Sequence, residues 1–77
     1  MKTKKVRRKL ALRKSFGANL KAEREARGLS QEALAHQAGL RHATIESVER
    51  GERSILINDI ERLARALGLE PADLVRR

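Results

Sequence analysis

The chain has 77 residues, a net charge of +8, one phenylalanine and no tryptophan, tyrosine or cysteine. A chain of this length forms one small domain, and the lack of cysteine excludes a disulfide framework or a thiolate metal site. Its apolar runs are only a few residues long, whereas a membrane-spanning helix needs ~20. A transmembrane protein, a secreted disulfide scaffold and a large enzyme are therefore excluded.

The excess positive charge lies entirely at the N-terminus. Residues 1–14 hold eight of the 18 basic side chains and no acid, whereas residues 15–77 hold ten basic and ten acidic side chains. A block of like charge repels itself and is typical of an arm that binds nucleic acid, although a solvated terminus without a partner is the alternative. We therefore divide the chain into a basic arm, residues 1–14, which is flexible or extends the first helix, and a domain over residues 15–77.

The first half of the domain predicts two short helices. Ser15 can cap the first helix, which ends at Gly28. Ser30 caps the second, which places apolar side chains inward and ends at Gly39. Both helices end at a glycine, the residue that most easily closes a helix.

The second half predicts three more helices. The third covers about residues 42–50, and a capping-box pattern at Asn58 and Glu61 begins the fourth, which ends at Gly68. Pro71 suits the first position of a short fifth helix. No stretch alternates with a period of two, so the prediction is an all-α, compact five-helix bundle.

Only three residues join the second and third helices, which indicates a helix-turn-helix. Ala35 stands where the two helices must approach closely, and Gly39 stands where the chain must turn sharply at little steric cost. Five apolar positions then fix the two helices to the domain: Leu34, Ala38, Leu40, Ile45 and Val48.

These positions resemble the phage-repressor-like (Xre) helix-turn-helix family. The resemblance is carried by residues 29–35, 38–40, 44–45, 48–53 and 60–69, and it covers residues 16–75. It implies a lambda-repressor-like DNA-binding domain that acts as a dimeric transcriptional regulator.

Within that family, Gly51-Glu52-Arg53 followed by residues 58–61 is similar to restriction–modification controller proteins. The sequence departs from the controllers at residues 41–44, where they usually have an acidic residue, Arg, Thr and Tyr. It also has Ile55 where the family usually has proline.

The third helix is then the recognition helix, whose outward residues face the major groove. Base readout is predicted for His42, Ala43, Glu46 and Ser47. His42 can donate to guanine, and Ala43 offers a methyl group to thymine. Glu46 can accept from cytosine N4, but a pair with Arg50, four residues further on, is favoured.

Phosphate contacts are predicted for Gln31, Thr44, Arg50 and Arg53. Gln31 begins the second helix, where free backbone N–H groups suit an anion. Such contacts position the protein but carry no base information. The family resemblance further implies that Arg24 and Glu49 form a structural ion pair between the first and third helices.

A dimer interface is predicted at the apolar run Ile55, Leu56 and Ile57, with Leu74 and Val75 contributing from the last helix. Three consecutive apolar residues cannot all point inward, so a monomer would expose part of this run. Core packing is the alternative explanation for the run.

No motif for catalysis, a metal or a cofactor is present, and His36 is interpreted as a surface histidine. The sequence thus predicts a cytoplasmic, bacterial or phage-encoded, sequence-specific regulator that binds a pseudo-palindromic double-stranded operator as a homodimer. We expect no enzymatic activity, no cofactor, no small-molecule ligand and no membrane association. The alternative is an antitoxin-type or adaptor protein whose helix-turn-helix mainly binds a protein partner.

Overall fold

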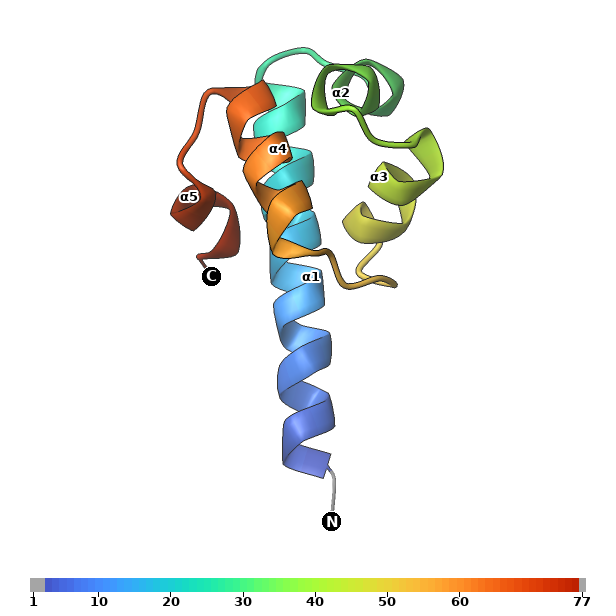
Figure 1. Ribbon diagram of the computed structural model, residues 1–77. Helices are drawn as coiled ribbons and strands as arrows, with labels where there is room; N and C mark the ends of the chain where they lie inside the picture. The colour runs from blue at the N-terminus through green and yellow to red at the C-terminus, as the bar shows by residue number, and fades with distance from the viewer. Residues whose placement is uncertain (1–2, 77) are drawn as a thin grey trace.

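The computed structural model describes the backbone of residues 3–76 and the side chains of residues 12–76. This part of the chain contains helices and no strand, which confirms the all-α prediction (Figure 1). The five helices are α1 Thr3–Ala26, α2 Gln31–Ala38, α3 His42–Glu49, α4 Ile57–Leu67 and α5 Pro71–Val75.

Helix α1 is the long axis of the bundle, and α3 and α5 pack against it on different sides (Figure 1). Helix α2 packs against both α3 and α4, and α5 packs against α4 as well as α1. The arrangement leaves α3 at one flank of the molecule, supported from behind by α1 and α2.

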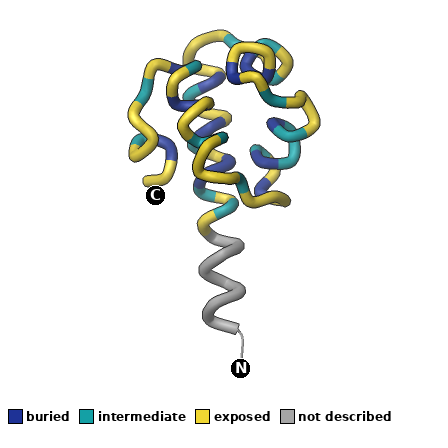
Figure 2. The backbone as a smooth tube through the Cα atoms, viewed as in Figure 1, coloured by how far each residue is buried: buried dark blue, intermediate teal, exposed yellow. Residues whose placement is uncertain are grey.

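A single apolar core lies between the helices (Figure 2). All five apolar helix-turn-helix positions contribute to it: Leu34, Ala38, Ile45 and Val48 are buried, and Leu40 is half-buried against the others. Helices α1, α4 and α5 complete the core with Phe16, Leu20, Leu63, Ala64, Leu67 and Leu74. Burial of these side chains provides the main stabilisation of a domain that has no disulfide.

One glycine closes the turn of the helix-turn-helix, and a second lets α1 pack closely against it. Gly39 ends α2 with a φ of +72°, and its backbone N–H donates to the carbonyl groups of Ala35 and His36. Gly17 lies where α1 crosses the end of α3, and a Cβ atom there would overlap the carbonyl oxygens of Val48 and Glu49. A glycine at position 17 therefore lets α1 approach α3 closely, a role that sequence analysis missed.

Two of the predicted helix starts are wrong. Helix α1 begins at Thr3 and not at Ser15, because no glycine or proline interrupts residues 3–14. Helix α4 has Leu56 as its N-cap, whose carbonyl oxygen accepts from the N–H groups of Asp59 and Ile60. Asn58 is therefore already inside α4.

The predicted start of α5 is correct, since Pro71 is its first residue. Sequence analysis missed the capping box in front of it, in which Glu70 and Asp73 each accept from the other's backbone N–H.

Candidate nucleic-acid interface

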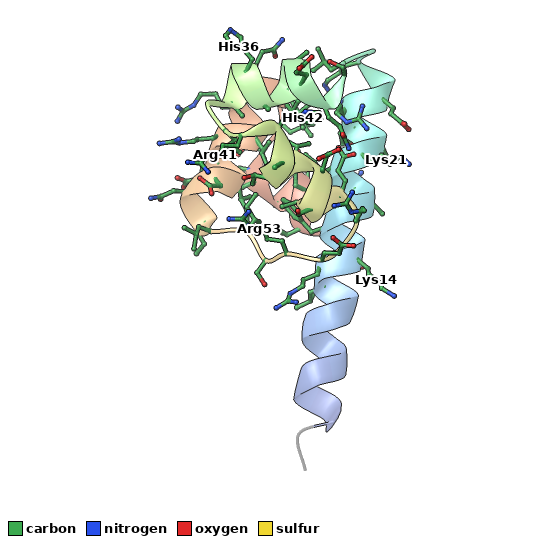
Figure 3. The ribbon with its side chains drawn as sticks, turned by 90° about the vertical axis from the view of Figure 1, so that its right-hand side faces the viewer. Lys14, Lys21, His36, Arg41, His42 and Arg53 are labelled. Atoms are coloured by element: carbon green, nitrogen blue, oxygen red, sulfur yellow. The ribbon has the colours of Figure 1, made fainter. Side chains whose placement is uncertain are left out.

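Helix α3 presents one polar face to solvent because its apolar residues, Ile45 and Val48, point into the core. His42 and Ala43 are exposed on that face, and Glu46 and Ser47 are half-buried. All four residues predicted to read bases therefore lie on the outward side of α3. Figure 3 is viewed onto this flank, with His42 at the start of α3 below α2.

Behind α3, Arg24 of α1 and Glu49 form a buried, two-pronged ion pair. Arg24 Nε donates to Glu49 Oε2 at 2.7 Å, and Arg24 Nη2 donates to Glu49 Oε1 at 2.9 Å. The Glu49 side chain is only 3% exposed, and Arg24 Nη1 also donates to the carbonyl oxygen of Leu29 at 2.8 Å. The pair thus ties the end of α3 to α1 and to the loop before α2.

The hydrogen bond with Glu49 raises the pKa of Arg24, although its burial acts in the opposite direction. A guanidinium is protonated throughout the working pH range in any case. The charge on Arg24 is therefore a fixed feature of the site.

Gln31 extends this ion pair to the outward face of α3. Its Nε2 donates to Glu49 Oε1 at 2.9 Å, and its Oε1 lies 3.2 Å from His42 Nε2. The NH₂ and the carbonyl oxygen of the Gln31 amide thus each have a side-chain partner within the protein. A phosphate at this position would therefore meet the backbone N–H groups of Gln31 and Glu32, which have no acceptor within the helix, whereas the N–H of Ala33 donates to Ser30 Oγ.

The predicted pair between Glu46 and Arg50 is wrong. Arg50 is the C-cap of α3, and its Nε donates to Glu52 Oε1 at 3.2 Å in the following turn. Glu46 Oε2 lies 4.0 Å from His42 Nε2, one turn earlier in α3. The backbone N–H of Arg50 still donates to the Glu46 carbonyl oxygen at 3.1 Å, but the Arg50 side chain turns toward Glu52 in the following turn and not toward the Glu46 carboxylate.

Two of the remaining predicted phosphate contacts, Thr44 and Arg53, line a hollow of about 350 Å³ next to α3, and Arg50 is not part of its lining. Ala43, half-buried Thr44 and exposed Arg53 line it, together with Arg41 and Asp59. Arg41 is the exposed N-cap of α3, and Figure 3 labels it and Arg53 on the same flank as His42. Sequence analysis missed Arg41 as a candidate contact, although its place directly before the recognition helix could have indicated it.

The predicted dimer residues divide into buried and exposed groups. Leu74 is wrong as an interface residue, because α5 packs it into the core with no exposed surface. Ile55 is half-buried against the core, whereas Leu56, Ile57 and Val75 are 73%, 75% and 48% exposed. The start of α4 and the end of α5, which carry the exposed group, lie at a similar height beside the middle of α1 (Figure 1).

A second hollow, of about 330 Å³, lies between α1, the loop before α4, α4 and α5, and of the exposed group Val75 lines it whereas Leu56 and Ile57 do not. It is mainly apolar, and its lining includes Leu12, Phe16, Ile55, Ile60 and Val75. Leu12 is also exposed, so it adds to the apolar surface and is a residue that sequence analysis did not consider.

His36 is exposed on α2 and lies apart from His42 (Figure 3). Among the side chains of residues 12–76, no three histidine, aspartate or glutamate residues gather closely enough to hold a metal ion. Within the described part of the chain, no helix combines the length and the apolar character needed to cross a membrane.

Comparison with known proteins gives a consistent set of matches. The family model HTH_3, described as helix-turn-helix, matches residues 20–74. Control protein C.BamHI of Bacillus amyloliquefaciens is 35% identical over 65 residues, covering 83% of this chain and 80% of that protein. The HTH-type transcriptional regulator y4dJ of Sinorhizobium fredii is 34% identical over 64 residues, covering 83% of each chain.

A solved structure is similar as well. The restriction–modification controller protein C.AhdI from Aeromonas hydrophila superposes with a TM-score of 0.81 and 44% sequence identity. The match covers 83% of this chain and 97% of the controller.

Proposed function

This chain belongs to the helix-turn-helix family HTH_3, and we propose that it is a sequence-specific, double-stranded DNA-binding regulator of transcription. The observation that carries the proposal is the outward face of α3. A buried ion pair ties the end of α3 to α1, and Arg41 and Arg53 flank the outward face of α3. Such a helix fits the major groove, where base edges present distinct hydrogen-bond patterns. The proposed role is binding and not catalysis.

Base readout is assigned to His42, Ala43, Glu46 and Ser47, because they occupy the outward side of α3. Phosphate contacts are assigned to the start of α2 and to the cations beside α3. Arg41 joins the predicted set here, because it lines the same hollow as Thr44 and Arg53. The set also contains Gln31, through its backbone at the start of α2, and Arg50 at the end of α3.

The basic arm, residues 1–14, supplies attraction to any duplex. It contains the entire net charge of the chain, and neutralising DNA phosphates releases condensed counterions whatever the base sequence. We propose that the arm raises the affinity for any DNA sequence, and that residues 15–77 provide the sequence specificity.

The names of the relatives narrow the proposal to the controller type of regulator. C.BamHI is named a control protein, and C.AhdI is named a restriction–modification controller. We therefore propose that this protein acts on bacterial or phage DNA in the cytoplasm, as a homodimer on a pseudo-palindromic operator. Two-fold symmetry then places the half-sites about 10 bp apart.

Two substitutions distinguish residues that read bases from residues that contact phosphates. Ser47→Ala removes a hydroxyl from the outward face of α3 and should lower discrimination at particular base pairs by about 1–3 kcal/mol. Arg53→Ala removes a cation from the loop and should weaken binding to selected and shuffled duplexes alike. Fluorescence anisotropy on a duplex selected from a randomised pool, and on its shuffled counterpart, measures both effects. Equal losses on the two duplexes for Ser47→Ala would place that residue outside the groove.

A further inference from the structure

The orientation of the Gln31 side-chain amide is determined by its neighbours. The carboxylate of Glu49 can only accept hydrogen bonds, and it already accepts two from Arg24. The Gln31 amide group beside Glu49 must therefore be the NH₂, which lies 2.9 Å from Glu49 Oε1. Its carbonyl oxygen is consequently the end that faces His42.

The neighbours of the His42 imidazole ring determine its tautomer as well. His42 Nε2 lies 3.2 Å from Gln31 Oε1 and 4.0 Å from Glu46 Oε2, and both of these oxygens are acceptors. Nε2 must then carry the hydrogen. A neutral imidazole has a single N–H group, so Nδ1 keeps its lone pair and is an acceptor.

The ring is placed so that this acceptor is available. His42 is exposed at the start of α3, and no protein group within the described side chains bonds to its Nδ1. The charged groups around the ring come from three helices. Glu46 lies on α3, Glu49 acts through Gln31 of α2, and Arg24 of α1 holds Glu49.

We propose that the chain of Arg24, Glu49 and Gln31 sets the tautomer of His42, so that the neutral ring offers Nδ1 as an acceptor and selects an amino group on the DNA. This inference rests on the proposed function for its DNA partner. In the major groove, adenine N6 and cytosine N4 are the amino donors, whereas guanine shows only acceptors. The prediction from sequence that His42 donates to guanine is thereby replaced by selection of adenine or cytosine.

The tautomer can be measured without DNA. Nitrogen-15 NMR of the full chain at pH 8 should show a single Nε2–H tautomer for His42. Gln31→Met removes both hydrogen bonds of the amide at similar size and should give a mixture of the two tautomers. Gln37→Met makes the same change at an exposed position of α2 and should leave the His42 signals unchanged. An Nδ1–H ring in the wild type, or no response to Gln31→Met, would overturn the proposal.

Selection of the amino group is tested on a duplex recovered from a randomised pool. The base pair to change is the one at which the His42→Ala variant discriminates less between bases than the wild type does. There, adenine is replaced by purine, or cytosine by the analogue that lacks the amino group. On removal of the amino group, the affinity of the wild type should fall about tenfold, as expected for one hydrogen bond in the groove. The affinity of the His42→Ala variant should fall by less than about twofold. Equal losses for the two proteins, or a wild-type preference for guanine at pH 8, would overturn the proposal.

The two measurements separate this inference from the proposed function. Failure to recover any preferred duplex would contradict sequence-specific binding and the selection of an amino group with it. The NMR result would still decide whether Gln31 sets the tautomer of His42.

Discussion

Glu49→Ala is expected to lower the free energy of unfolding by about 3–5 kcal/mol, because it leaves the buried Arg24 guanidinium without its partner. Two hydrogen bonds from Arg24 and one from Gln31 end on the carboxylate of Glu49. Truncation removes both oxygens that accept these three hydrogen bonds, at a side chain that is nearly inaccessible to water. Urea unfolding, followed by the helical circular dichroism signal, measures the loss.

Two controls isolate the ion pair. Glu46→Ala removes a carboxylate from the same helix at a partly exposed position and should change stability by no more than about 0.5 kcal/mol. The double variant Arg24→Met/Glu49→Leu removes both charges together and should recover most of the loss, since an apolar pair often replaces a buried ion pair at little cost. A loss below about 1 kcal/mol for Glu49→Ala would show that the pair is not a structural support of α3.

Leu56→Glu is expected to give a folded monomer whose affinity for the operator is lower by about 10²–10⁴-fold, because two linked half-sites no longer bind together. Leu56 and Ile57 are largely exposed, so a charge at position 56 leaves the core intact but opposes burial of the apolar surface against a second copy. Sedimentation at micromolar concentration gives the oligomeric state, and anisotropy gives the affinity.

Asn58→Glu provides the matched control for Leu56→Glu. It adds the same charge two residues further along, at an exposed polar position within α4, and should leave the dimer intact. A wild-type protein that is monomeric and protects only one half-site would contradict the dimer proposal. Unfolding of Leu56→Glu would contradict the expectation that a charge at position 56 leaves the core intact.

The features that sequence predicted well depend on local geometry. The close packing at Ala35, the turn at Gly39 and the burial of Ile45 and Val48 follow from spacing within two adjacent helices. Periodicity is sufficient there, since a helix fixes which side chains share a face.

The features that sequence missed depend on contacts between distant segments. Gln31 meets Glu49 and His42 only because α2 and α3 pack together, and no pattern along the chain encodes which end of its amide faces which partner. Leu74 is buried because α5 folds back onto α1 and α4. Gly17 carries no signal in the sequence until α3 is placed against it.

These contacts change how the interface is understood. From the sequence, the outward residues of α3 are independent contacts, each with its own base or phosphate. In the folded chain, His42 is connected through Gln31 to the ion pair that holds α3 in place. Support of the recognition helix and presentation of its first side chain therefore depend on the same carboxylate of Glu49.

The central claim is that this domain chooses among DNA sequences, and one comparison tests it most directly. The affinity of the wild-type chain is measured for a duplex selected from a randomised pool and for a shuffled duplex of the same composition, at one salt concentration. The account predicts at least about a 10³-fold preference for the selected duplex, as specific DNA-binding proteins show. Equal affinity for the two duplexes would contradict it, because binding would then rest only on contacts that do not depend on the base sequence.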